Sequence, residues 1–163
     1  MSMPEPSLKG RALRLLSGRE YSRAELERKL KHYEAQPGEL ARALDELQAK
    51  GSIDERRVLE SLVHRRAPKL GAARIQQELR SKGLDADAVK EAVAGLQETE
   101  TERARAAWRK KFGPSPPAAD APQGTSAAER GRQMRFLAAR GFTTDTIRRV
   151  VAGGSNDREG ESD

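Results

Sequence analysis

An apolar pattern recurs along this chain at an interval of about fifty residues, and it constrains the fold more than any other feature. Five leucines between positions 26 and 47 are matched by five aliphatic residues that stand 49 positions later, without a gap. Because residues four apart lie on one face of a helix, each set predicts two helices whose apolar stripes pack together. The first set is Leu26, Leu30, Leu40, Leu44 and Leu47, and the second is Ile75, Leu79, Val89, Val93 and Leu96.

The pattern appears a third time near the C-terminal end. A shift of 58 positions from the second set reaches Leu137, Ile147 and Val151, and the nine additional positions correspond to a proline- and alanine-rich loop at 113–126. Another segment with helical apolar spacing precedes each pair. Helices this short are marginal alone and need packing within and between units. We therefore predict an all-α protein of three tandem three-helix repeats, with about nine helices, that forms an elongated curved array.

The same pattern gives an expected domain order. The predicted segments are a flexible N-terminus at 1–7, a first repeat at 8–50, a second repeat at 51–97, a third repeat at 98–152 that contains the loop 113–126, and an acidic disordered tail at 153–163. The tail carries four acidic residues and one arginine. Runs of small, polar and charged residues such as this one cannot bury enough apolar surface to fold.

Local signals indicate where several helices begin and end. Ser22 with Glu25 three residues later is a capping box, and Pro37 fits the first turn of a following helix. Gly83 and Gly141 each follow a cationic residue, where a left-handed glycine ends a helix. Glutamate and lysine residues at helical spacing, as in the pair Glu25–Lys29, predict ion pairs on solvated helix faces.

The sequence contains none of the residue groupings that catalysis or metal binding would require. There is no cysteine, and the two histidines, His32 and His64, belong to different predicted helices without a second ligand at metal-binding spacing. No glycine-rich phosphate loop is present. We expect neither an enzyme nor a cofactor or metal. No apolar run reaches the ~20 residues of a membrane span, so we expect a cytoplasmic protein without a membrane partner.

Positive charge dominates the part of the chain that precedes the tail. The net charge is +6, and because the tail contributes −3, the remainder carries +9. The charge predicts either contacts with phosphates or an acidic protein groove, or ordinary solvated helix faces. Trp108, beside three cations, predicts either a base-stacking platform or a core position. The candidate contact residues are Arg65, Arg66, Lys69, Arg74, Arg80, Lys82, Arg132, Arg135, Arg140, Arg148 and Arg149.

Three segments together resemble the RecX family of regulators of the RecA recombinase. The segment "RRAPKLGAARIQQELRSKGL" at 65–84 is similar to that family's R…G…RI…EL…KG-[IL] pattern. The segment "ALRLLSGREYSRAELERKL" at 12–30 resembles its first unit, and "FLAARGFTTDTI" at 136–147 resembles its closing unit. The likeness covers roughly residues 8–152, in order and with suitable spacing.

The resemblance implies a negative modulator that binds the groove of the RecA–single-stranded DNA filament. It implies limited filament growth and lower ATPase, strand-exchange, recombination and SOS activity. The implied partners are the RecA filament and single-stranded DNA, with double-stranded DNA as a further partner, and we expect a monomer. The residues leave a second interpretation open: a direct DNA-binding helical protein, such as a helix-turn-helix-like regulator or an architectural protein.

Overall fold

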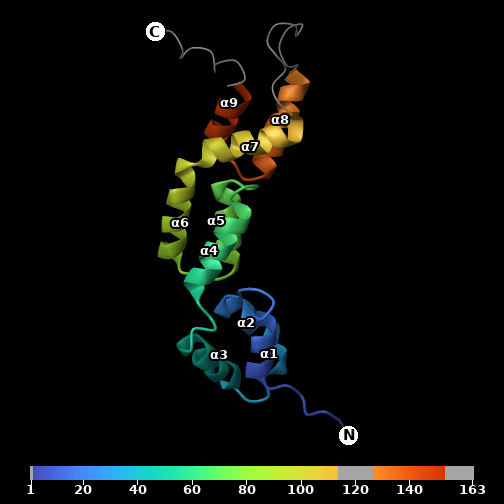
Figure 1. The fold of residues 1–163 in the computed structure, drawn as a ribbon, viewed down its shortest axis with the longest axis vertical. Helices are drawn as coiled ribbons and strands as arrows, with labels where there is room; N and C mark the ends of the chain where they lie inside the picture. The colour runs from blue at the N-terminus through green and yellow to red at the C-terminus, as the bar shows by residue number, and fades with distance from the viewer. Residues whose placement is uncertain (1, 114–126, 153–163) are drawn as a thin grey trace. The chain divides into compact units, whose positions relative to one another are not determined.

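The structure is a computed structural model that describes residues 2–113 and 127–152. Within these ranges the regular elements are nine α-helices and one short 3-10 helix, with no strand (Figure 1). They are α1 (Leu8–Leu16), α2 (Arg23–Leu30), η1 (Lys31–Tyr33), α3 (Glu39–Ala49), α4 (Glu55–Arg66), α5 (Ala72–Ser81), α6 (Ala86–Glu98), α7 (Glu100–Phe112), α8 (Ala127–Ala139) and α9 (Thr144–Ala152).

The predicted all-α fold of three three-helix repeats is confirmed. All ten residues of the first two apolar sets are buried, on α2 and α3 for the first set and on α5 and α6 for the second. Burial of these side chains is the main stabilising contribution that the repeat offers each short helix. The elongated, curved arrangement of the repeats stays a prediction.

The chain divides into two compact units. Unit 1 consists of Met1–Leu62 and Glu78–Val89, and unit 2 consists of Val63–Gln77 and Lys90–Asp163. The division falls inside the three helices of the middle repeat, α4, α5 and α6. The predicted loop, apart from Gly113, and the predicted acidic tail lie outside the described residues.

In unit 1, α1, α2 and α3 pack against one another in pairs. Their shared core consists of aliphatic side chains and Tyr21, and it includes Ile53, which follows α3. The guanidinium carbon of Arg19 lies 3.6 Å from the centroid of the Tyr21 ring. The buried members of the core are Leu8, Ala12, Tyr21, Leu26, Leu30, Leu40, Leu44, Leu47 and Ile53.

In unit 2, α7, α8 and α9 form the corresponding core. Small side chains on α7, Ala104 and Ala107, let the neighbouring helices approach closely. The sequence pattern placed Val151 on the apolar face of α9, where it is partly buried and packs against the core, while the neighbouring Val150, which the pattern did not include, is buried. The buried members are Ala104, Ala107, Leu137, Phe142, Ile147 and Val150.

Several predicted helix ends are confirmed. Gly83 and Gly141 have φ angles of +69° and +86°, in the left-handed region, directly after α5 and α8. The Ser22 hydroxyl accepts from the amide of Glu25 at 3.2 Å, so Ser22 is the N-cap of α2, while the Glu25 carboxylate bonds to Lys82 and Arg19 in place of the reciprocal contact of a capping box. The placement of Pro37 in the first turn is wrong: α3 begins at Glu39 with Gly38 as its N-cap at a φ of +85°, so Pro37 lies one residue before the cap.

Candidate interaction surface

Two joints connect the repeats, and they use equivalent positions. In each joint, the beginning of the second helix of one repeat contacts the turn that ends the second helix of the next repeat. We call the contact between α2 and the end of α5 the first joint, and the contact between α5 and the end of α8 the second joint. The first joint lies within unit 1 and the second within unit 2.

In the first joint, the Ser22 hydroxyl donates to the carbonyl of Lys82 at 2.6 Å. The amide of Arg23, the first residue of α2, donates to the Glu55 carboxylate at 3.2 Å. Glu55 is itself the first residue of α4. Arg28 adds a bond from its guanidinium to the carbonyl of Ser81 at 2.8 Å. The free amide at the start of α2 and the free carbonyls at the end of α5 are therefore satisfied by neighbouring repeats.

The second joint repeats these bonds. The amide of Gly71 donates to the carbonyl of Arg140 at 2.8 Å, and the amide of Ala72 donates to the Glu100 carboxylate at 3.1 Å. Glu100 is the first residue of α7. The Arg74 guanidinium donates to the carbonyl of Ala139 at 3.0 Å.

The two joints correspond position by position through the shifts of the apolar pattern. Ser22 and Gly71 are 49 residues apart, and Lys82 and Arg140 are 58 residues apart. A hydroxyl in one joint and a backbone amide in the other therefore reach equivalent carbonyl groups. The repeat in the sequence thus encodes a repeated contact as well as a repeated core.

Glu25 strengthens the first joint with a charged contact. Its carboxylate is 8% exposed and accepts from Lys82 Nζ at 2.6 Å and from Arg19 Nη2 at 2.8 Å. Burial alone would raise the pKa of Glu25, but the hydrogen bonds from Lys82 and Arg19 outweigh it and lower the pKa below its ordinary value. The predicted ion pair of Glu25 with Lys29 is wrong, because tertiary partners take this carboxylate instead.

Glu100 stabilises the second joint by accepting hydrogen bonds from uncharged donors. Its side chain is 3% exposed, and its Oε2 atom accepts from the hydroxyls of Thr143 at 3.1 Å and Thr146 at 2.9 Å. Both threonines precede or begin α9, so one carboxylate fixes the starts of α5 and α9 together. The equivalent Glu55 differs, since its Oε2 atom is buried without a hydrogen-bond partner.

Arg103 on α7 satisfies three carbonyl groups in unit 2. Its guanidinium donates to Ala67 at 3.0 Å, to Leu70 at 2.6 Å and to Leu96 at 2.9 Å. Burial lowers the pKa of Arg103, and the charge of the nearby Glu100 partly offsets that effect. Sequence reasoning missed both Arg103 and Glu100, although an acidic residue at the start of a predicted helix was a signal available for Glu100.

The structure separates the eleven predicted contact residues into two groups. The side chains of Lys82, Arg74 and Arg140 form hydrogen bonds within the joints. The other eight are exposed, and one of them, Arg149, pairs with Asp145 at 3.0 Å. These eight exposed residues are Arg65, Arg66, Lys69, Arg80, Arg132, Arg135, Arg148 and Arg149.

The predicted residues do not all belong to one unit. Arg80 and Lys82 lie in unit 1, and the other nine lie in unit 2. The second joint brings Lys69 and Arg140 together, with a 3.5 Å bond from the Arg140 guanidinium to the Lys69 carbonyl. Exposed cations on α8 and α9, namely Arg132, Arg135 and Arg148, take no part in the joint contacts described above.

Trp108 is partly buried against the core of unit 2. Its indole nitrogen donates to the Gln133 side chain at 3.0 Å, and its ring lies 6.3 Å from that of Phe112. These contacts support the core interpretation over the base-stacking one, because the polar end of the ring is already satisfied inside the protein.

The described residues include neither a metal-binding cluster nor a membrane-spanning helix. These ranges hold no cluster of three or more histidine, aspartate or glutamate side chains that could bind a metal ion. Among the same residues, no helix has the length and apolar character needed to cross a membrane.

Comparison with known proteins identifies three domains along the chain. Sequence models of the RecX family match residues 9–47 as "RecX, first three-helix domain", residues 54–93 as the second and residues 98–151 as the third. A protein of Leptothrix cholodnii named "Regulatory protein RecX" is 51% identical over 91% of this chain and 89% of its own length. The protein of that name from Chromobacterium violaceum is 43% identical over 96% of this chain and 97% of its own length.

A solved structure has the same fold. The crystal structure of RecX from Lactobacillus salivarius superposes with a TM-score of 0.69, covering 90% of this chain and 93% of that one. Its sequence is 18% identical, so this likeness supports the fold alone.

Proposed function

The chain belongs to the RecX family, and we propose that it acts as a negative modulator of the RecA recombinase. In this proposal it binds the groove of the RecA–single-stranded DNA filament and limits filament growth. Lower ATP hydrolysis, strand exchange, recombination and SOS activity follow, because each depends on the filament. The observation that carries the proposal is the family match across all three repeats, at up to 51% identity over most of the chain.

The exposed cations of α8 and α9 supply the contact surface in this proposal. Arg132, Arg135 and Arg148 are exposed and carry no joint contact, so they are available to carboxylates or phosphates of a partner. Lys82, Arg74 and Arg140 take a different role in it: they hold the repeats in register.

We propose that the protein works as a monomer in the cytoplasm, with the repeat boundaries at residues 8–50, 51–97 and 98–152.

The direct test is RecA's DNA-dependent ATPase, together with filament length by electron microscopy, in the presence of the purified full chain. We expect both to fall at stoichiometric amounts of the protein. A variant with Arg132→Glu, Arg135→Glu and Arg148→Glu should lose most of the effect. A matched control, Arg42→Glu with Lys50→Glu and Lys90→Glu, changes the net charge equally at exposed positions elsewhere and should keep it. Unchanged ATPase and filament length with the wild-type chain would reject the proposal.

Direct DNA binding is the second candidate function, and the same exposed arginines favour it. Phosphate contacts release counterions, so affinity should fall with salt by a log–log slope of about 0.7 per phosphate for single strands and about 0.9 for duplexes. Fluorescence anisotropy of labelled single- and double-stranded DNA without RecA, at several salt concentrations, measures this slope. Binding that is absent or insensitive to salt would count against the second candidate.

A further inference from the structure

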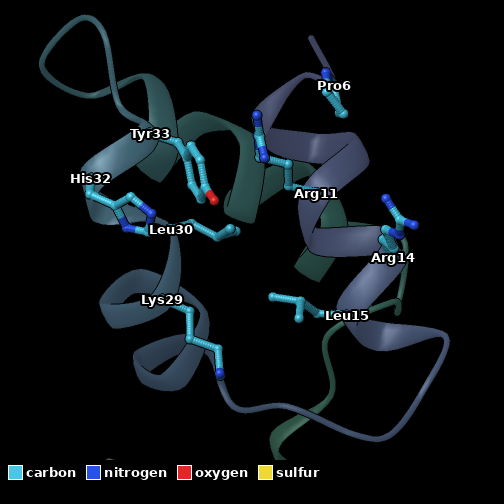
Figure 2. A pocket seen from close by; sticks show the side chains of 8 residues that line it. All are labelled: Pro6, Arg11, Arg14, Leu15, Lys29, Leu30, His32 and Tyr33. Atoms are coloured by element: carbon cyan, nitrogen blue, oxygen red, sulfur yellow. The ribbon is translucent and has the colours of Figure 1, made fainter.

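A pocket lies on the first repeat, between α1 on one side and the end of α2 with η1 on the other (Figure 2). Its volume is about 270 Å³, enough for one large side chain and its neighbouring polar atoms. All of its lining residues belong to unit 1. None of them is among the contact residues predicted from the sequence.

The floor of the pocket is apolar. Leu15 from α1 and Leu30 from α2 point into the space between the helices from opposite sides (Figure 2). Leu30 belongs to the core of the repeat and the partly buried Leu15 packs against it, so the floor is continuous with that core. An apolar ligand group that covers these side chains would gain the free energy of removing apolar surface from water.

The rim of the pocket is cationic. Arg11, Arg14 and Lys29 line it, with no carboxylate among the lining residues. Within residues 2–113 and 127–152, neither Arg14 nor Lys29 makes an ion pair. Among the described residues, the ion pair of Arg11 is a 3.8 Å contact with Glu5, a side chain that is 92% exposed. Guanidinium groups in this setting bind carboxylates in fork geometry.

The ring of Tyr33, at the rim of the pocket, already contacts Arg11 and His32. These contacts help to decide between a nucleic acid and an acidic peptide as the anionic ligand. The Arg11 guanidinium lies 3.8 Å from the centroid of the Tyr33 ring, and the His32 ring lies 3.9 Å from it. A nucleobase binds by stacking on an open aromatic face, so these contacts disfavour a nucleic acid in the pocket. A peptide that carries a carboxylate beside an aliphatic or aromatic side chain fits the pocket without displacing Arg11 or His32 from the Tyr33 ring.

We infer that this pocket binds an acidic peptide segment of a partner protein that carries one large apolar side chain. The apolar side chain lies on Leu15 and Leu30, and the flanking carboxylates pair with Arg11, Arg14 and Lys29. This inference does not depend on the proposed action on RecA, because it rests on the pocket itself and its test contains no RecA.

The test is titration of the full chain with the fluorescein-labelled peptide EEDSFDEE, followed by anisotropy and by amide chemical shifts of isotope-labelled protein. We expect saturable binding that shifts resonances of α1, α2 and η1. The double variant Arg14→Glu and Lys29→Glu should bind at least about tenfold more weakly, since it reverses two rim charges. The control double variant Arg42→Glu and Lys50→Glu, with the same change of net charge on α3 and the turn after it, should bind as the wild type does. Circular dichroism checks that both variants fold.

Two further probes separate the contributions. The peptide EEDSSDEE keeps the charge and lacks the apolar group, and it should bind at least about tenfold more weakly. A labelled oligothymidylate should leave the pocket resonances unchanged. The inference is overturned if EEDSFDEE does not bind, if the control variant loses as much affinity as the rim variant, if EEDSSDEE binds equally well, or if the oligothymidylate shifts the pocket resonances.

Discussion

At the scale of single residues, position 71 requires glycine because its backbone lies very close to the backbone of Gly141 in the second joint. A Cβ atom at this position would lie 2.2 Å from the carbonyl oxygen of Gly141, which is backbone and cannot move aside alone. Gly141 itself has a positive φ, and a Cβ there would lie 2.4 Å from that of Arg74. Both glycines are therefore required by packing, and Gly141 is required by its backbone conformation as well.

This packing gives a pair of opposite predictions. Gly71→Ala should destabilise the protein by about 2 kcal/mol or more, because the joint must open to admit the methyl group. Gly95→Ala, in the interior of α6 with no atom within 4 Å of the added methyl, should be neutral or stabilise by up to about 1 kcal/mol. Urea unfolding followed by circular dichroism measures both. Equal stability of the two variants would contradict the close approach.

Glu25 predicts a pH dependence of stability. Its pKa is lowered in the folded protein from an ordinary value of 4.5, so its contribution is complete above that value and is lost as the pH falls through the lower, folded value. Glu25→Gln should therefore lose stability at neutral pH and show a shallower fall of stability in acid. Urea midpoints measured across this pH range for both proteins check the prediction. Parallel pH profiles for the two proteins would show that Glu25 does not contribute.

At the scale of helices, each joint caps a helix of one repeat with a glutamate from the next. Glu55 accepts from the first amide of α2, and Glu100 accepts from the first amide of α5. Only Glu100 also receives two threonine hydroxyls, through the oxygen that in Glu55 has no partner. The two equivalent carboxylates therefore contribute unequally to the joints that they hold.

Alanine substitution of each glutamate tests this inequality. Glu100→Ala leaves three donors without their acceptor and should destabilise by about 2–4 kcal/mol, since each lost bond to a charged group is worth about 1 kcal/mol or more. Glu55→Ala removes one bond and should cost about 1 kcal/mol. Thermal unfolding of the two variants compares them directly. A larger loss for Glu55→Ala would contradict the assignment.

The elements were predictable from the sequence because their apolar spacing and end signals are local. Gly83 and Gly141 show this, since each stands after cationic residues at the end of an apolar stripe. The joints were not predictable, because their bonds link residues 28 to 71 positions apart and use backbone groups that have no signature in the sequence. For the same reason the ion pair of Lys82 with Glu25 was not predictable, and the predicted contact of Lys82 with a partner stays a prediction.

At the scale of the whole molecule, the sequence predicts an elongated, curved array of repeats. A compact chain of this length would have a radius of gyration of about 15 Å by the scaling of globular domains. We expect small-angle X-ray scattering of the purified protein to give a clearly larger value, because stacked repeats extend in one direction. A value near the compact estimate would contradict the predicted array while leaving the three-repeat fold unchanged.

At this scale the positive net charge and the family could be predicted from the sequence. The positions of the residues that contact a partner could not. Long cationic side chains on helix faces have the same spacing whether they bind a partner, pair internally or face water. Arg132 and Arg74 illustrate the ambiguity: both were predicted as contacts, yet Arg74 bonds to the Ala139 carbonyl and Arg132 is exposed outside the joints.

Co-sedimentation tests most directly whether this chain binds the RecA–single-stranded DNA filament. RecA filaments assembled on single-stranded DNA with ATP are pelleted by ultracentrifugation together with the purified full chain. We predict that the chain enters the pellet only when RecA, DNA and ATP are all present, and that the Arg132→Glu, Arg135→Glu, Arg148→Glu variant enters it less. A wild-type chain that remains in the supernatant under these conditions would contradict the claim.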